Sequence, residues 1–302
     1  MSQPIPRQQL EETIVPMPLG RDPIASYPFY CVHSISGNAI AEFRHLASCL
    51  APDIAFFAIQ VPKAQRTEAT GSSLLAMATH YCDLVVAHHR EHFADKPFAL
   101  GGWSAGSIVA LEMAQQLKKL GHAPQLLIAI DKCPRHTRAE IGDWNSGLRN
   151  VWLWLKRSWR NSDTWGQAAR SLASKFWLII RHRQLYGGPD SEYSSAAVIA
   201  DLTKSARSVN ERAFISAFYA RTTAYIPSSY HGRVLILVTK DGYKDRVIEG
   251  WREIARDLVV VRIPGSHMSA VMGRRLAHNR RDLDDVRALA VVLRSELRMA
   301  LG

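Results

Sequence analysis

The stretch KPFALGGWSAGSIVALEMAQQL, residues 96–117, decides the fold of this chain. Its residues 98–100 form a short apolar run that predicts a buried strand, and a helix-forming run follows a few positions later. Ser104 lies between the two, so the turn around it must be very sharp. Gly102 and Gly106 flank the serine at the positions where a larger side chain would have no room.

The five residues from Gly102 to Gly106 match the G-x-S-x-G pattern of a nucleophile elbow. In that turn a strand passes directly into a helix, and the serine hydroxyl is exposed above the carboxyl end of a sheet. The free N–H groups at the helix N-terminus can then receive negative charge. We therefore predict that Ser104 is a nucleophile. The alternative is a glycine-rich turn that carries an ordinary serine.

Apolar runs alternate with helix-forming segments along most of the chain, which predicts a parallel, doubly wound α/β sheet. The expected strands are residues 28–33, 54–60, 98–100, 125–131, 232–240 and 258–265. The expected helices are residues 39–50, 73–93, 106–120 and 282–300.

Two segments fall outside this alternation. Residues 1–27 contain five prolines, so we expect a polar, extended lead-in or linker there rather than a helix. Residues 28–302 form the main domain, with an insertion over about 135–229 that holds six of the eight tryptophans. We interpret the insertion as a helical lid, because it follows a strand's carboxyl end, where ligands bind in open α/β sheets. Its segment 148–160 also fits an ordinary amphipathic helix or an interfacial membrane helix.

Ser104 needs a general base and a third group that orients the base, since a serine hydroxyl is a poor nucleophile at neutral pH. His267 directly follows the last expected strand, and Gly265 allows the tight turn that brings the imidazole back over the sheet. We therefore predict that His267 is the base. Asp131 and Asp241 each follow a strand, and spacing alone leaves both open as the acid.

An oxyanion hole needs two backbone N–H groups aimed at the charge that develops during acyl transfer. We expect one from Ala105, the residue after the predicted nucleophile. The other should come from the loop after the first core strand, residues 33–39, where Ser36 and Gly37 permit a turned backbone. Ile35 is the predicted donor in that loop.

The length and composition of the chain suit one large domain. A chain of 302 residues with 47% hydrophobic composition can bury a full core. It contains no apolar run near the roughly 18 residues that cross a bilayer. Its first residues carry charges and prolines where a signal peptide has an apolar segment. We therefore expect a cytoplasmic protein without membrane contact.

The four cysteines, at positions 31, 49, 82 and 133, show neither C-x-x-C pairing nor a histidine at metal-binding spacing. We expect reduced, buried thiols, with no disulfide framework and no metal site.

The net charge of +11 is concentrated in one region. Residues 132–231 hold fifteen Lys and Arg against seven Asp and Glu, a surplus of +8. A positive field there favours an acidic partner. No nucleic-acid-binding motif accompanies the charge, so we do not expect a nucleic acid partner.

Several segments together resemble the thioesterase domains that end nonribosomal peptide and polyketide assembly lines. Residues 99–134 are similar to the nucleophile block of that family almost position for position, and residues 264–271, PGSHMSAV, are similar to its histidine loop. Residues 15–39 resemble its entry strand and oxyanion loop, although the loop lacks the proline that is common there. Residues 222–237 resemble the exit from its lid.

The resemblance implies the α/β-hydrolase fold and favours Asp131 as the acid, because the family usually takes its acid from the strand after the elbow helix. The implied triad is Ser104, Asp131 and His267, with an oxyanion hole from Ile35 and Ala105. Asp241 remains the rival acid.

The resemblance also implies a reaction and a partner. An acyl or peptidyl chain would arrive as a thioester on the phosphopantetheine arm of a carrier protein, either fused to this chain or separate. An acyl-serine would form, and water or an internal nucleophile would release a free acid or a ring. No metal or redox cofactor is needed for this chemistry. The alternatives are a free-standing editing thioesterase, a generic carboxylesterase or lipase of the same fold, and a catalytically silent binding module.

Overall fold

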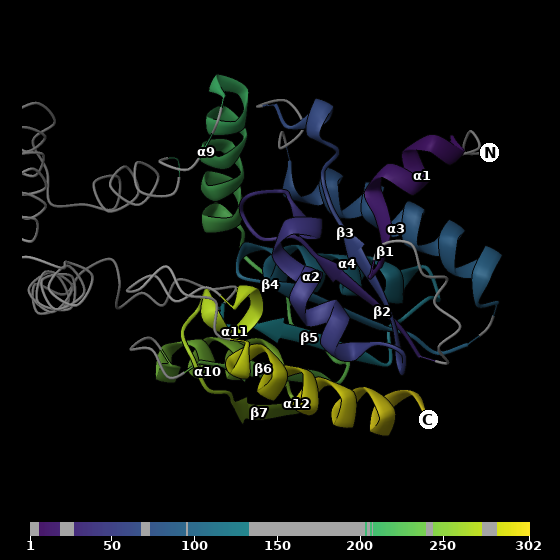
Figure 1. Cartoon of the computed structure of the whole chain (residues 1–302), viewed down its shortest axis with the longest axis vertical. Helices are drawn as coiled ribbons and strands as arrows, with labels where there is room; N and C mark the ends of the chain where they lie inside the picture. Colours follow the sequence, from purple (N-terminus) through teal and green to yellow (C-terminus); the bar gives the residue numbers. More distant parts are fainter. Residues whose placement is uncertain are drawn as a thin grey trace, which may run out of the picture.

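A seven-stranded sheet forms the centre of the protein (Figure 1). The computed structural model describes residues 6–18, 27–67, 73–94, 96–132, 203, 206, 208–239, 244–273 and 283–302. The strand order is β1-β3-β2-β4-β5-β6-β7. β1 pairs antiparallel with β3, and all other neighbouring strands are parallel. The predicted mostly parallel α/β sheet is therefore confirmed.

The strands in the middle of the sheet are apolar along their whole length, as expected for strands with both faces covered. Every residue of β3, β4, β5 and β6 is buried. The strands are β1 (Ile14–Met17), β2 (Tyr27–Val32), β3 (Ile54–Ile59), β4 (Ala99–Trp103), β5 (Leu126–Ile130), β6 (Val234–Val238) and β7 (Leu258–Arg262).

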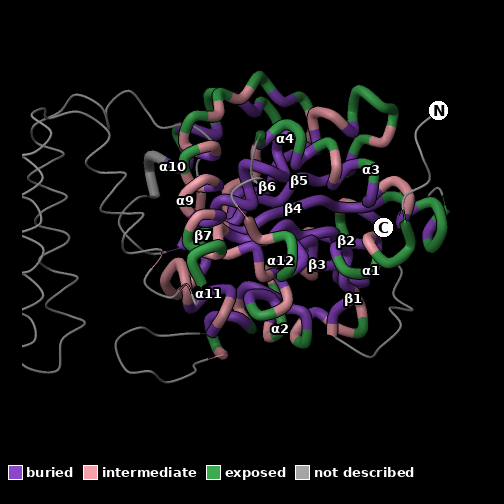
Figure 2. Tube along the Cα trace, turned by 90° about the horizontal axis from the view of Figure 1, so that it is seen from above, coloured by how far each residue is buried: buried purple, intermediate pink, exposed green. Residues whose placement is uncertain are grey.

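Helices cover both faces of the sheet, so that the molecule has three layers (Figure 2). One apolar cluster joins the sheet to α3 (Leu74–His92), α4 (Ala105–Lys119) and α10 (Lys244–Ile254). A second cluster on the opposite face joins it to α2 (Ala39–Leu50), α11 (Ser269–Met272) and α12 (Asp284–Leu301). A short 3-10 helix, η1 (Lys63–Gln65), follows β3.

The prediction of an extended lead-in is wrong for residues 6–18, which the structure describes. Helix α1 (Arg7–Thr13) leads directly into β1, the antiparallel edge strand. The prolines permit this arrangement, because Pro6 lies at the N-cap of α1 and none follows until Pro16, in the edge strand. The segment is thus part of the sheet.

The predicted lid is described only near its end. Residues 133–202, which include Cys133 and segment 148–160, lie outside the described residues. Helix α9 (Val209–Ala224) is described, and its Phe214 and Phe218 are buried and stacked on each other. Both rings approach His33 at the end of β2, with ring centroids 6.4 and 5.4 Å away. The last helix of the insertion therefore packs on the carboxyl edge of the sheet.

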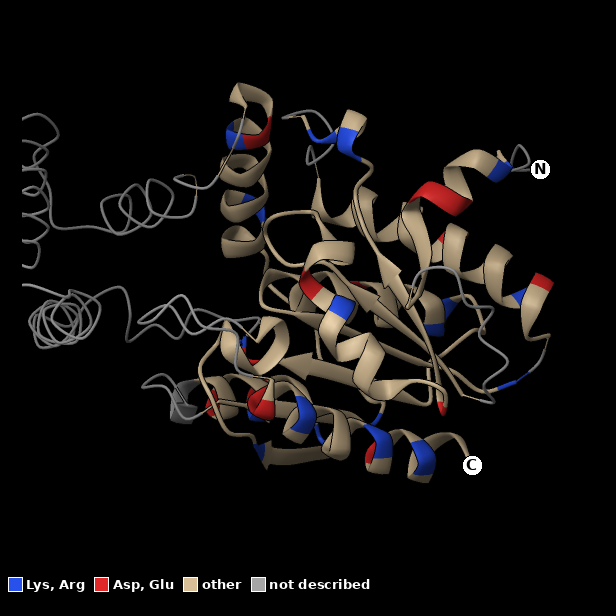
Figure 3. Ribbon diagram, in the orientation of Figure 1, with Lys and Arg blue, Asp and Glu red and all other residues tan. Residues whose placement is uncertain are grey.

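Arginines and acidic residues recur along α12 (Figure 3). Arg294 and Arg298 each form an ion pair with Asp53 at 3.0 Å, which ties α12 to the turn before β3. These side chains are partly exposed, so each pair contributes about 1 kcal/mol or less to stability. No helix in the described part of the chain is long and apolar enough to cross a membrane.

Candidate active site

Ser104 occupies the strained turn that the sequence predicts. Its backbone angles are φ 55° and ψ −128°, and it joins β4 directly to α4. The Ser104 N–H donates to the carbonyl of Ile130 at 3.0 Å. The buried Ser107 hydroxyl donates to the Gly102 carbonyl at 2.7 Å and accepts from the Ile130 N–H at 3.2 Å. Bonds to the neighbouring strand thus hold the turn in place.

Both elbow glycines are required by close backbone contacts. A Cβ on Gly102 would lie 2.2 Å from the carbonyl oxygen of Gly106. A Cβ on Gly106 would lie 2.3 Å from the carbonyl oxygen of His33 and 2.5 Å from that of Val32. The N-terminus of α4 therefore lies directly against the start of the loop that follows β2.

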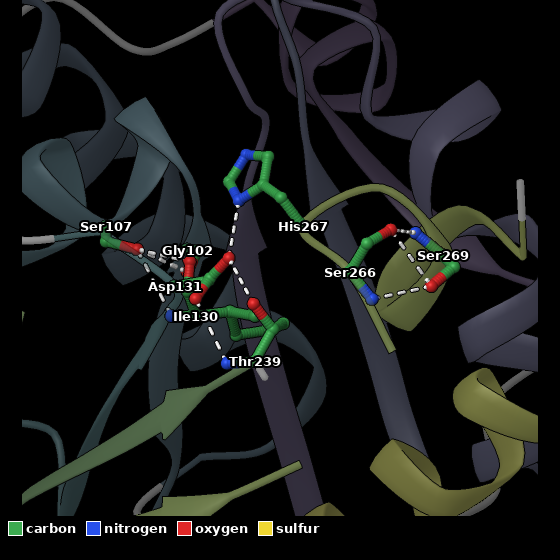
Figure 4. A network of polar contacts seen from close by, with 8 residues as sticks. All are labelled: Gly102, Ser107, Ile130, Asp131, Thr239, Ser266, His267 and Ser269. Carbon is green, nitrogen blue, oxygen red and sulfur yellow. Dashed lines mark hydrogen bonds and ion pairs between the residues drawn. The ribbon is translucent and has the colours of Figure 1, made fainter. Parts of the chain in front are cut away.

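Asp131 and His267 meet at the carboxyl edge of the sheet (Figure 4). The His267 Nδ1 lies 2.8 Å from the Asp131 Oδ2. The Asp131 carboxylate also accepts from the Thr239 hydroxyl at 2.9 Å and from the Thr239 N–H at 3.1 Å. The Asp131 side chain is 12% exposed and that of His267 is 31% exposed, so solvent reaches the imidazole more readily than its partner.

A small capping network fixes the loop that carries His267. Gly265 has φ 87°, and a Cβ there would meet the Asp285 carboxylate at 2.4 Å. The N–H groups of Ser266 and Ser269 each donate to the other's hydroxyl, at 2.8 and 3.2 Å. The Ser269 hydroxyl donates to the buried Asp285 carboxylate at 2.7 Å. Hydrogen bonds therefore fix the turn from which the His267 imidazole extends.

The ring of Trp103 lies beside the His267 imidazole, with centroids 5.2 Å apart and planes inclined by 32°. Trp103 is 2% exposed, so it forms an apolar wall on that side of the ring.

The predicted oxyanion donors lie on the two segments that meet at Gly106. Ala105 is the first residue of α4, so its N–H is among the amides that have no acceptor within the helix. Ile35 lies in the loop after β2, where Gly37 has φ 72° as the predicted turn requires. The structure thus brings the two segments together, as the sequence predicts.

His33 anchors the base of that loop as a neutral side chain. Its Nε2 lies 2.9 Å from the Tyr81 hydroxyl and its Nδ1 lies 2.5 Å from the Ser34 carbonyl oxygen. Burial lowers the pKa of His33 to about 4. The imidazole is fully buried and therefore uncharged at neutral pH.

Several residues that support the site were missed by the sequence reasoning. Thr239 binds Asp131 from the neighbouring strand, Ser107 holds the elbow, and Asp285 holds the histidine loop. Of these three residues, only Thr239 could have been suspected from the sequence, because it lies at the carboxyl end of an expected strand. The rival acid Asp241 lies outside the described residues, as do its neighbours from 240 to 243. Within the described ranges, no group of three or more His, Cys, Asp or Glu side chains could hold a metal ion.

A strained serine turn, a carboxylate–histidine pair and two candidate amide donors lie at the carboxyl ends of the parallel strands, on a mostly parallel sheet of the α/β-hydrolase type. A family model described as "Thioesterase domain" matches residues 27–151. This segment contains the elbow, the oxyanion loop and Asp131. Residues 27–151 of the chain are thus similar to thioesterase domains.

The curated relatives are much longer proteins. Inactive atromentin synthetase invA6 of Paxillus involutus is 27% identical over 144 residues, which cover 48% of this chain and 14% of the relative. Erythronolide synthase EryA3 of Saccharopolyspora erythraea is 31% identical over 134 residues, 44% of this chain and 4% of the relative. This chain thus matches only a small part of each relative.

Solved thioesterase domains match over nearly the whole chain. The NocB thioesterase domain, in covalent complex with a fluorophosphonate nocardicin G analog, is 26% identical with a TM-score of 0.55, covering 93% of this chain and 97% of that one. SrfTE, the thioesterase domain described for cyclization of the lipopeptide antibiotic surfactin, is 14% identical with a TM-score of 0.54. It covers 95% of this chain and 96% of its own, and it supports the fold alone.

Proposed function

We propose that this protein is a serine thioesterase that releases an acyl or peptidyl chain from the phosphopantetheine arm of a carrier protein. The observation that carries the proposal is the Asp131–His267 hydrogen bond at the strand ends beside the strained Ser104 elbow, within a thioesterase domain. The partner is proposed because the relatives include polyketide synthases, and the holo form of a four-domain nonribosomal peptide synthetase is among the structural neighbours.

In the first half of the proposed reaction, the Ser104 Oγ attacks the thioester carbonyl and passes its proton to the His267 Nε2. Asp131 holds the imidazole through Nδ1 and stabilises its positive charge. The N–H groups of Ile35 and Ala105 stabilise the oxyanion. The C–S bond then breaks, the thiol leaves with the proton from His267, and the acyl group remains on Ser104.

In the second half, His267 takes a proton from water or from an amine or hydroxyl of the chain itself. The activated group attacks the acyl-serine, and His267 returns the proton to the Ser104 Oγ. Water gives a free acid, and an internal nucleophile gives a ring. The thiol leaving group and the oxyanion hole supply the chemistry, so the proposed reaction requires no metal or redox cofactor.

The proposal is tested by comparing three forms of one acyl group: on a phosphopantetheinylated carrier protein, as an N-acetylcysteamine thioester, and as a p-nitrophenyl ester. We expect both thioesters to be turned over, and Ser104→Ala to lower kcat about 10⁴-fold or more. Product masses distinguish hydrolysis from cyclisation. Cleavage of the oxygen ester alone would identify a generic esterase. Binding of the carrier protein without any turnover would identify a binding module.

A further inference from the structure

A buried carboxylate lies behind the loop that holds Ile35. Glu42, in the first turn of α2, is 3% exposed. Its Oε2 accepts from the Ser34 N–H at 2.7 Å, and its Oε1 accepts from the Ser34 hydroxyl at 2.5 Å. The Ser36 hydroxyl also donates to Oε1. Three donors on both sides of Ile35 therefore converge on one side chain.

Four further amides of this loop also have acceptors. The His33 N–H donates to the Ile59 carbonyl at 3.0 Å, and the Gly37 N–H donates to the Ser34 carbonyl at 3.2 Å. The N–H groups of Ser36 and Asn38 donate to the hydroxyls of the two serines that bind the carboxylate, at 3.4 and 3.1 Å. Among the described residues, only the Ile35 N–H of residues 33–38 has no acceptor.

Glu42 is the one charged residue among the buried residues of α2, whose other buried side chains, such as Phe43 and Leu46, are apolar. Burial raises the pKa of Glu42, while hydrogen bonds from Ser34 and Ser36 and the nearby Arg66 lower it. A buried charge is unfavourable unless donors surround it. The hydrogen-bond donors to this carboxylate all belong to the loop, and Arg66, which acts through its charge, lies close to Gly37 within it.

We infer that Glu42 is the positioning residue of the oxyanion hole: its carboxylate binds Ser34 and Ser36 and thereby leaves the Ile35 N–H, between them, free to bind the oxyanion. The inference rests on the proposed function for the identity of the reaction, but it applies to any attack by Ser104 on a carbonyl or phosphorus centre. Glu42 does not touch the reacting atoms in this account. Its effect is on the transition state, where the oxyanion hole acts.

The variant Glu42→Ala tests the inference, with Glu112→Ala as its matched control. Glu112 is a second largely buried glutamate, but its hydrogen bonds run to Tyr225 and Gln116, away from the oxyanion loop. We expect E42A to lower kcat for the N-acetylcysteamine thioester about 10²-fold with little change in KM. E112A should keep kcat within about twofold of wild type even if both variants melt at a lower temperature.

If Glu42 acts by holding the loop in place, Glu42→Gln should have an intermediate kcat. Its oxygen still accepts the Ser34 N–H and its amide still reaches both hydroxyls, so kcat should fall between those of wild type and E42A. A folded E42A with wild-type kcat would overturn the inference. So would an equal loss of kcat in E42A and E112A.

A second readout separates this inference from the proposed function. The rate at which a fluorophosphonate labels Ser104 depends on an oxyanion hole but not on a thioester substrate, and we expect it to fall about 10²-fold in E42A. If wild type is labelled at a Glu42-dependent rate but turns over no thioester, the proposed function fails and the role of Glu42 stands. If thioesters are turned over and E42A labels like wild type, the role of Glu42 fails alone. If Ser104 is not labelled in wild type, both fail.

Discussion

The two sides of Ser104 are built by different means. On one side, the elbow and Asp131 rest on the ends of adjacent parallel strands, and backbone contacts fix them. On the other side, the oxyanion loop is held by buried polar side chains, above all Glu42 and His33. The active site thus combines the elbow and Asp131, which the sheet makes rigid, with an oxyanion loop that depends on single side chains. The two parts should therefore respond differently to mutation and to pH.

The largest effect is expected on the strand-end side, at the acid. Asp131→Asn removes the negative charge that stabilises the His267 imidazolium and should lower kcat about 10⁴-fold. The rival Asp241→Asn should stay within about twofold of wild type. Steady-state kinetics on the thioester decide between them. The reverse order of the two losses would make Asp241 the acid and remove Asp131 from the triad.

The junction between the two sides should be the most sensitive place for folding. Gly106→Ala forces a Cβ against two carbonyl oxygens of the backbone, so we expect it to lower the free energy of unfolding by more than about 4 kcal/mol or to prevent folding. Gly121→Ala is the control, because Gly121 has φ 80° but open space around it. That variant should lose only about 1–2 kcal/mol. Equal urea midpoints for the two variants would contradict the close contact.

The buried side chains that hold the oxyanion loop should make the stability of the protein depend on pH. The pKa of His33 is about 4 in the folded state against 6.5 in the unfolded state. The unfolded state therefore binds more protons in this window, and stability falls as the pH drops from 6.5 towards 4. Glu42 acts in the opposite direction, because its folded-state pKa is raised.

A variant isolates the contribution of His33. His33→Gln cannot titrate, so the difference in unfolding free energy between wild type and H33Q should shrink by about 1.4 kcal/mol per pH unit below 6.5. Urea titrations at several pH values measure it, with exposed His231→Gln as the control. A wild-type to H33Q difference that is constant with pH would show that His33 does not lose its proton affinity on folding.

The features that could be predicted from the sequence are those that local patterns specify. The elbow, the strand ends and helix α2 depend on local patterns: glycines two positions from a serine, apolar runs, and Asn38 as the N-cap. His267 could be placed because it follows the last strand. Helix α1 was not predicted because the number of prolines suggested an extended segment, whereas their positions leave residues 7–13 free of proline.

The supporting side chains could not be predicted because their contacts depend on the folded backbone and not on a local sequence pattern. Glu42 looks like an ordinary first-turn glutamate, and only the turned backbone of the loop brings Ser34 and Ser36 to its carboxylate. Thr239 meets Asp131 only because β5 and β6 are neighbours, although 108 positions separate the two residues. The lid over residues 135–229 and the carrier-protein partner remain predictions.

The most direct test of the central claim is the mass of the protein during turnover. Intact-protein mass spectrometry after rapid acid quench, followed by peptide mapping, would locate any acyl group left by the N-acetylcysteamine thioester. We expect one acyl group on Ser104, absent in Ser104→Ala and short-lived in wild type. Turnover at full rate in Ser104→Ala, or an acyl group on another residue such as Cys133, would contradict it.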